Sequence, residues 1–280
     1  MVVLAIDIGG TKHSLALFED RRLIRWGTFP TNPRGCAWTV EHLKTLLPRW
    51  LEGVRPEACG IGFGGPVDYA AQRVGRSMHL GGWQDFPLAA VMAEHLGVPC
   101  RIDNDANLGA LGEWAAGAGQ GAASLLYVTL STGIGAGILI GGEIWHGADS
   151  LAGELGHVTI QTDGPECPCG QRGCFEALCS GRAIEARTGR PAAELLQDAA
   201  FRAEYVPNLA RGLRVALLLV NPERVVIGGG LSKAGEVLFR ELRADLERQI
   251  PASLPVRVDV RPAALGDFSV LWGAAVLAEA

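Results

Sequence analysis

The side chains best suited to chemistry lie in one short segment, in which His157 is followed by Cys167, Cys169 and Cys174. One imidazole and three thiolates form a closed tetrahedral ligand set for a structural zinc ion. The Cys-x-Cys spacing is too short for an unstrained disulfide, and nearby glycines allow the chain to turn back toward the same ion. Cysteines that merely fill a core beside an unrelated histidine would not need this spacing. The segment therefore predicts a bound Zn²⁺.

Two glycine-rich turns follow apolar stretches and are suited to binding phosphate. The first comprises Gly9, Gly10, Thr11 and Lys12, with Asp7 just before it, and the second comprises Ser131, Thr132 and Gly133. Such turns present backbone N–H groups and a threonine hydroxyl, with no large side chain in the way of a phosphate. One such turn alone is more often a plain hairpin, but two at matched positions predict a clamp on a nucleotide phosphate tail. Asp7 would then orient Mg²⁺ or its water ligands.

The other glycine-rich segments are weaker candidates for nucleotide binding. Residues 60–65 satisfy G-x-G-x-x-G, but they fall within an expected strand and Pro66 follows in place of a helix, so the context of a dinucleotide site is missing. The P-loop motif G-x-x-x-x-G-K-[ST] does not occur in the sequence. Gly229, in the run 228–230, ends an expected strand and opens a helix, where bare backbone can lie flat against an adenosine.

Composition describes an ordinary globular chain. It has 280 residues, of which 48% are hydrophobic and 20% charged, and a net charge of −5. The negative charge argues against a surface for duplex nucleic acid, and no apolar run approaches the roughly 18–20 residues of a membrane span. The first residues reach Asp7 without a basic segment, which predicts a strand rather than a signal peptide. Scattered cysteines outside the zinc segment favour a reducing cytoplasm.

The expected elements repeat in two halves, each opening with strand, glycine turn and strand. This plan predicts two α/β domains that face a cleft, with the last helix packed back on the first domain; one continuous open sheet is the alternative. Strands are expected at 2–8, 14–18, 23–28, 58–63, 99–103, 125–130, 134–140, near 144, 224–227 and 256–260. Helices are expected at 37–51 and 88–96, and beginning near 106, 175, 208, 232 and 269.

These motifs together resemble the ROK (repressor, open reading frame, kinase) family of sugar kinases. The resemblance covers essentially the whole chain, and its most specific part is the signature G-H-x9-C-x-C-G-x-x-G-C-x-E from residue 156 to Glu176. Residues 5–12, 104–107, 131–137 and 153–157 also match family segments. The resemblance implies an α/β fold, namely the duplicated actin-like ATPase (ribonuclease H-like) fold with two domains around a cleft. The expected domains are 1–107 plus 268–280, and 108–267, the second carrying the zinc site.

The resemblance also assigns roles to individual residues. Asp105 becomes the general base that takes the proton of a sugar hydroxyl as the γ-phosphate of ATP transfers in line. From the sequence alone, Asp105 is equally an N-cap of the helix that follows, and Glu154 and Glu176 are surface acids by default. The implied sugar ligands are Asn104, Asp105, Glu154, His157 and Glu176. The implied nucleotide-binding residues are Asp7, Gly9, Gly10, Thr11, Lys12, Thr132, Gly133 and Gly229.

The expected activity is an ATP-dependent hexose kinase acting on the 6-hydroxyl, with structural Zn²⁺ and with Mg²⁺ accompanying ATP. Glucose is the expected sugar and N-acetylmannosamine the alternative, because residues 167–184 resemble both groups. His79 stands where relatives usually carry an asparagine, which leaves the identity of the sugar open. A sugar-sensing regulator is an alternative of another class, but the first glycine turn begins too close to Met1 for a preceding DNA-binding domain. The expected partners are the hexose and ATP, with no nucleic acid and no membrane, in a cytoplasmic homodimer or homotetramer. Polyphosphate remains open as the phosphoryl donor.

Overall fold

The computed structural model describes residues 1–10, 12–31, 35–77 and 81–280. Two mixed five-stranded sheets form the framework, and their strands follow the same spatial order, third-second-first-fourth-fifth, in the two halves of the chain. The first sheet contains β1 (Val2–Ile8), β2 (Lys12–Glu19), β3 (Arg22–Pro30), β4 (Ala58–Phe63) and β7 (Cys100–Asn104). The second contains β8 (Ser124–Leu130), β9 (Ile134–Ile140), β10 (Glu143–Ile144), β11 (Arg224–Gly228) and β12 (Val260–Pro262). The duplicated plan is confirmed, and the single continuous sheet is excluded.

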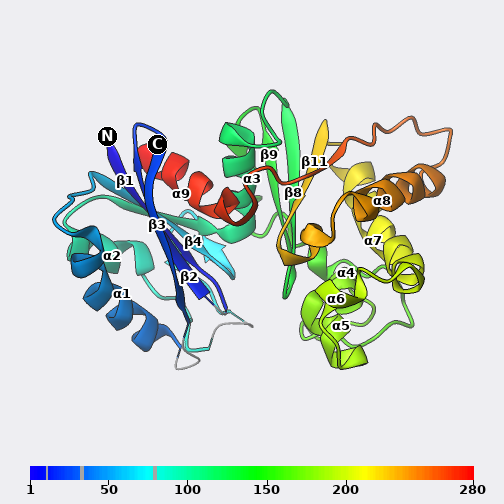
Figure 1. Ribbon diagram of the computed structural model, residues 1–280, viewed down its shortest axis with the longest axis horizontal. Coiled ribbons are helices and arrows are strands. Elements are labelled where there is room, and N and C mark those ends of the chain that lie inside the picture. Colours follow the sequence, from blue (N-terminus) through cyan, green and yellow to red (C-terminus); the bar gives the residue numbers. More distant parts are fainter. Residues whose placement is uncertain (11, 32–34, 78–80) are drawn as a thin grey trace.

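Helices cover both faces of each sheet. They are α1 (Cys36–Leu51), α2 (Leu88–Leu96), α3 (Asp105–Ala116), α4 (Phe175–Cys179), α5 (Gly181–Thr188), α6 (Ala192–Leu195), α7 (Ala199–Leu219), α8 (Glu236–Gln249) and α9 (Ser269–Glu279). Figure 1 shows α1 and α2 outside the first sheet, α3 and α9 between the sheets, and α7 and α8 outside the second sheet. Within the described residues, no helix combines the length and apolar character that crossing a bilayer requires.

The helix pair α3–α9 joins the two halves through a shared core. Side chains from the inner faces of both sheets, such as Val3 on β1 and Tyr127 on β8, pack in one buried cluster with these two helices. The helices approach so closely that a Cβ at Gly112 would lie 2.0 Å from the Ser269 oxygen, and one at Gly273 would lie 1.9 Å from the Leu108 oxygen. Glycine at both positions is therefore a requirement of the crossing. The last helix packs against β1 and β4, as the sequence predicts.

Three boundary predictions are wrong. The helix expected from residue 208 begins at Ala199, because Asp198 caps it by accepting a hydrogen bond from the Ala200 N–H at 2.9 Å. The strand expected at 256–260 is β12, Val260–Pro262, which pairs in parallel with β11. The helix expected from residue 232 is a short 3₁₀ segment, η2 (Gly230–Ala234), and α8 begins after it.

Candidate active site

Asp7 lies near the carboxyl end of β1, and Asp105 directly follows the carboxyl end of β7; both strands run parallel to β4, which lies between them. Ile6 and Ile8 pack into the core on the α1 side of β1, so alternation turns Asp7 to the opposite face, toward α3. Partial burial raises the pKa of Asp7 to about 7, with a further contribution from the charge of Asp105. Partial burial likewise raises the pKa of Asp105 to about 6. Two carboxyl groups in one poorly solvated place are thus poised to titrate near neutral pH.

Asn104, not Asp105, caps helix α3. Its Oδ1 accepts hydrogen bonds from the N–H groups of Ala106 and Asn107 at 2.9 and 3.4 Å. Its Nδ2 donates to the Gly65 oxygen at 3.0 Å. Asp105 is the first residue of the helix, and its Oδ1 accepts a hydrogen bond from the adjacent Ala106 N–H at 2.8 Å. The N-cap interpretation of Asp105 is therefore wrong.

The turn that carries Glu154 and His157 comes from the second half of the chain. It forms η1 (Leu155–His157), and Nε2 of His157 lies 3.7 Å from Oε2 of Glu154. Partial burial raises the pKa of Glu154; His157 opposes this shift and the charge of Glu176 adds to it. Glu176 is only 7% exposed, and its Oε2 accepts a hydrogen bond from the Ile134 N–H at 2.7 Å. Glu176 is therefore no solvated surface acid.

Four acids predicted from the sequence act on one another electrostatically although they come from four different elements. The charge of Asp105 raises the pKa of Asp7, that of Glu154 raises the pKa of Asp105, and that of Glu176 raises the pKa of Glu154. The fold thus brings acids from β1, from α3, from the residue before η1 and from α4 into one region. A group of carboxylates in this state can accept protons and hydroxyl hydrogen bonds and can bind a cation.

The cysteine and histidine cluster has the dimensions of a tetrahedral metal site. One ligand atom each from His157, Cys167, Cys169 and Cys174 lies within 4.8 Å of all the others. The Sγ atoms of Cys169 and Cys174 are 3.6 Å apart, and Cys167 Sγ is 3.8 Å from His157 Nδ1. Zinc–sulfur bonds of about 2.3 Å at tetrahedral angles would place two sulfurs about 3.8 Å apart. The four residues therefore fit such an ion.

The two glycine turns lie where the sequence predicts them, each between the first two strands of its sheet. In the first turn the Gly9 N–H donates to the Lys12 oxygen at 2.9 Å; Thr11 lies outside the described residues. The second turn rests on the start of α5, where the Gly181 N–H donates to the Ser131 oxygen at 2.8 Å and the Arg182 N–H to the Thr132 oxygen at 3.2 Å. His79, where relatives usually carry an asparagine, also lies outside the described residues.

A cavity of about 370 Å³ opens beside the second turn. Thr132 and Gly230, next to the predicted Gly229, are part of its wall. Sequence reasoning missed Arg182, Glu185 and the segment 191–193, which complete the wall. The only available signal was the Ser-Gly-Arg segment that precedes α5, because nothing in the sequence indicates that α5 and α6 fold against the second glycine turn.

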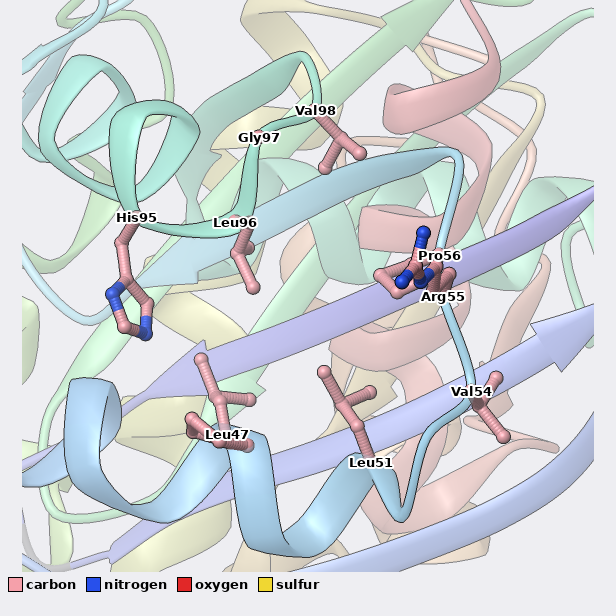
Figure 2. Close-up of a pocket in the computed structure, with 10 residues that line it drawn as sticks. Leu47, Leu51, Val54, Arg55, Pro56, His95, Leu96, Gly97 and Val98 are labelled. Atoms are coloured by element: carbon pink, nitrogen blue, oxygen red, sulfur yellow. The ribbon is translucent and has the colours of Figure 1, made fainter.

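Another cavity, of about 400 Å³, is unrelated to these acids. Figure 2 shows Leu47 and Leu51 of α1 on one side of this cavity, with Leu96, the last residue of α2, and Val98 just after the helix on the other side. This cavity lies near the amino ends of β4 and β7, whereas Asp7 and Asp105 lie at the carboxyl ends of their strands. Ligands of α/β sheets bind at the carboxyl ends, so the acids and not this cavity mark the candidate active site.

Duplicated sheets around a shared helix pair, with acids and two glycine turns at their carboxyl ends, define a protein of the actin-like ATPase class. More specifically, the chain belongs to the ROK family, whose family model matches residues 3–280. It is 32% identical over 308 residues to a glucokinase of Halalkalibacterium halodurans, covering 96% of this chain and 93% of that one.

Two further similarities bear on the choice of substrate. An N-acetylmannosamine kinase of Vibrio cholerae is 31% identical over 270 residues, covering 91% of this chain and 93% of that one. The structure of a ROK family glucokinase from Streptomyces griseus, in complex with glucose and AMPPNP, superposes with a TM-score of 0.87 at 30% identity. That comparison covers 100% of this chain and 99% of the other.

Proposed function

We propose that this protein is an ATP-dependent hexose kinase that transfers the γ-phosphoryl group of ATP to the 6-hydroxyl of glucose. The observation that carries the proposal is Asp105, a partly buried carboxyl at the start of α3 whose pKa is raised to about 6. A general base is most effective when its pKa lies near the working pH. At neutral pH Asp105 is mostly ionised and still basic enough to take a proton from a sugar hydroxyl as phosphate transfer begins.

On the nucleotide side, the two glycine turns supply backbone N–H groups to the phosphate tail. The cavity beside Thr132 and Arg182 would take the adenosine, whose ring could lie against Gly229 and Gly230. The pKa of Asp7 is raised mainly by burial, and the positive charge of Lys12 at the first turn partly opposes this shift. Magnesium entering with ATP neutralises phosphate charge, and Asp7 would bind it through its water ligands.

On the sugar side, hydrogen bonds to the ring hydroxyls would come from four residues: Asn104, Glu154, His157 and Glu176. Each carboxylate oxygen can accept from a separate hydroxyl, which suits adjacent hydroxyls of a pyranose. We assign Zn²⁺ to the cluster of His157 and the three cysteines, in a structural role. Because Nδ1 of His157 faces the cysteines and Nε2 faces Glu154, a bound ion would fix the orientation of the ring toward the sugar.

The proposal includes a cytoplasmic homodimer or homotetramer, with no nucleic acid or membrane partner. The support for an oligomer is three exposed apolar side chains, Ile140 at the end of β9 and Trp145 and Leu151 in the segment after β10, which are 52%, 58% and 53% exposed. Light scattering coupled to gel filtration measures the oligomeric state, and charged substitution of Trp145 should dissociate an oligomer that uses these side chains.

The decisive experiment is a panel of hexoses assayed with Mg·ATP by coupled ADP release. Glucose is expected to be phosphorylated at position 6, and 6-deoxyglucose to inhibit competitively without being phosphorylated, because it lacks the acceptor hydroxyl. Preference for N-acetylmannosamine would support the alternative that the Vibrio relative suggests. Polyphosphate in place of ATP tests the donor. Absence of hexose-dependent ADP release across the panel would overturn the proposal.

A further inference from the structure

Tyr69 and Asp103 form a socket on the first half of the chain. Tyr69 lies in the turn between two short strands, β5 (Val67–Asp68) and β6 (Arg73–Val74). Gln72 in the same turn accepts a hydrogen bond from the Ile102 N–H at 2.9 Å and donates to the Ile102 oxygen at 3.3 Å. These bonds attach the turn to β7 one residue before Asp103, so the positions of the Tyr69 ring and the Asp103 carboxylate are set together.

His146, from the second half of the chain, fills this socket. Its Nε2 donates to Oδ2 of Asp103 at 2.7 Å, and its ring stacks on Tyr69 with centroids 3.8 Å apart and planes inclined by 13°. The side chains of Asp103 and His146 are 1% and 18% exposed. Ser150 adds a second link between the halves, because its Oγ accepts from the Tyr69 N–H at 3.2 Å. A charged hydrogen bond shielded from water holds one geometry better than an exposed one.

The Asp103 end of this contact leads directly to the proposed base. Oδ1 of Asp103 accepts hydrogen bonds from the Asn104 N–H at 2.7 Å and from Asn107 Nδ2 at 2.9 Å. Asn104 directly precedes Asp105, and Asn107 lies two residues after it. The carboxylate that holds His146 therefore also holds the backbone from which Asp105 projects.

The His146 end leads to the proposed sugar turn. The His146 oxygen accepts from the Ala152 N–H at 3.0 Å and closes the loop between them. The next residue, Gly153, accepts through its oxygen from the Ala136 N–H on β9 at 3.1 Å, and Glu154 follows. Hydrogen bonds joined by short covalent stretches of the chain thus connect the strand end next to Asp105 with the residues that directly precede Glu154.

We propose that His146 is a positioning residue that sets the Glu154–His157 turn relative to Asp105, acting through Asp103 and Tyr69. The inference rests on the proposed hexose kinase activity, because it assigns the two ends to the base and to the sugar ligands. The nucleotide turns lie on other loops and have no hydrogen bond to His146 among the described residues. Loss of the contact should therefore affect the sugar far more than ATP.

The test compares His146→Ala with His146→Gln, in which an amide N–H can still reach Asp103. His146→Ala is expected to raise the hexose KM about 10- to 100-fold, the range for losing a hydrogen bond to a charged group, with the ATP KM changed less than about twofold. His146→Gln is expected to recover most of the loss. The double variant Asp103→Asn/His146→Ala should raise the hexose KM little more than either single substitution does, because both remove the same contact. The matched control is His95→Ala, at an exposed position of α2.

Hydrogen exchange separates this inference from the proposed function, because it needs no turnover. In His146→Ala, amides of residues 152–157 are expected to exchange at least about tenfold faster, with those of α8 unchanged. An unchanged hexose KM, or equal losses for hexose and ATP, would overturn the positioning role even in an active kinase. If the wild-type protein phosphorylates no hexose, the proposed function fails, and unchanged exchange at residues 152–157 would then refute the physical coupling as well.

Discussion

Ser269, the first residue of α9, donates a hydrogen bond from its Oγ to Oε1 of Glu113 in α3, at 2.7 Å. Glu113 is fully buried, and its carboxylate also accepts from the N–H groups of Ala118, Ala264 and Leu265 at 2.8, 3.0 and 2.9 Å. One carboxylate thus joins the end of α3 to the segment that leads into α9. Since α3 and α9 lie between the two sheets, this residue holds together the connection between the halves.

We expect Glu113→Gln to lower the free energy of unfolding by about 2–4 kcal/mol, as for disruption of a buried charged network. The amide replaces one acceptor oxygen with a donor, which then faces backbone N–H groups that are donors themselves. Urea denaturation measures the effect. Glu94→Gln, at an exposed position of α2, is the control and should change the free energy by less than about 0.5 kcal/mol. Equal stability of the two variants would show that the network contributes nothing.

Asp105→Asn should fold and bind hexose but transfer phosphate about 10²–10⁴-fold more slowly, the range for losing a general base. The amide keeps the shape of the side chain and cannot accept the proton. Steady-state kcat and the hexose Kd, measured separately, check this. A kcat close to that of the wild type would remove Asp105 from the base role.

The acid limb of the pH–rate profile should lie well above the ordinary aspartate pKa. Burial raises the pKa of Asp105 from 3.8 to about 6, so the reactive carboxylate is lost as pH falls through that value. We expect kcat/KM for hexose to fall about tenfold per pH unit below it. Glu154→Gln should move the limb to lower pH, because the charge of Glu154 helps to raise the pKa of Asp105. A midpoint near 4 in the wild type would contradict this prediction.

His13 is a buried group outside the candidate site that should weaken the fold in acid. Its side chain on β2 is fully buried and packs against Phe29 and His42, and neither ring nitrogen has a hydrogen-bond partner among the described residues. Burial, with a smaller effect of His42, lowers the pKa of His13 from 6.5 to about 4. The unfolded chain therefore binds a proton that the folded chain resists, and stability is lost as pH falls from about 6.5 to about 4.

The difference in unfolding free energy between His13→Phe and the wild type should shift in favour of the variant by about 2 kcal/mol when the pH is lowered from 7 to 4.5. The phenyl ring can keep the stacking on Phe29 and has no proton to gain. Thermal or urea unfolding at several pH values gives the difference curve. A difference that does not change with pH would mean that His13 finds a partner or water in solution. His95→Phe, at an exposed site, should show no such trend.

Cys174→Ser should lower the zinc content from about one ion per chain to nearly none, because it removes one of four ligands. The hexose KM should rise as His157 and Glu176 lose their anchor, with a smaller effect on ATP. Metal analysis after dialysis and steady-state kinetics measure the two effects. Cys100→Ser, outside the cluster, should retain the metal. Metal-free protein with a normal hexose KM would argue against the structural role.

The sequence by itself determined the features that depend on local spacing. His157 and the three cysteines had to meet because four ligands lie within eighteen residues, and turns rich in glycine and proline leave the chain free to bring them together. The glycine turns and the duplicated strand order also follow from short patterns of apolar runs and breakers. The family resemblance extended this to Asp105, whose position at the end of β7 was already evident.

Only the tertiary structure decided which distant residues meet. Nothing local relates Asp103 to His146, or Glu113 to Ser269, because these contacts depend on how two sheets pack around α3 and α9. The burial of Glu176, the cap made by Asn104 and the position of β12 likewise result from neighbours far along the chain. Hydrophobic periodicity records which face of an element is buried but not its partner, and the partner determines the pKa of a carboxyl and the place of a strand.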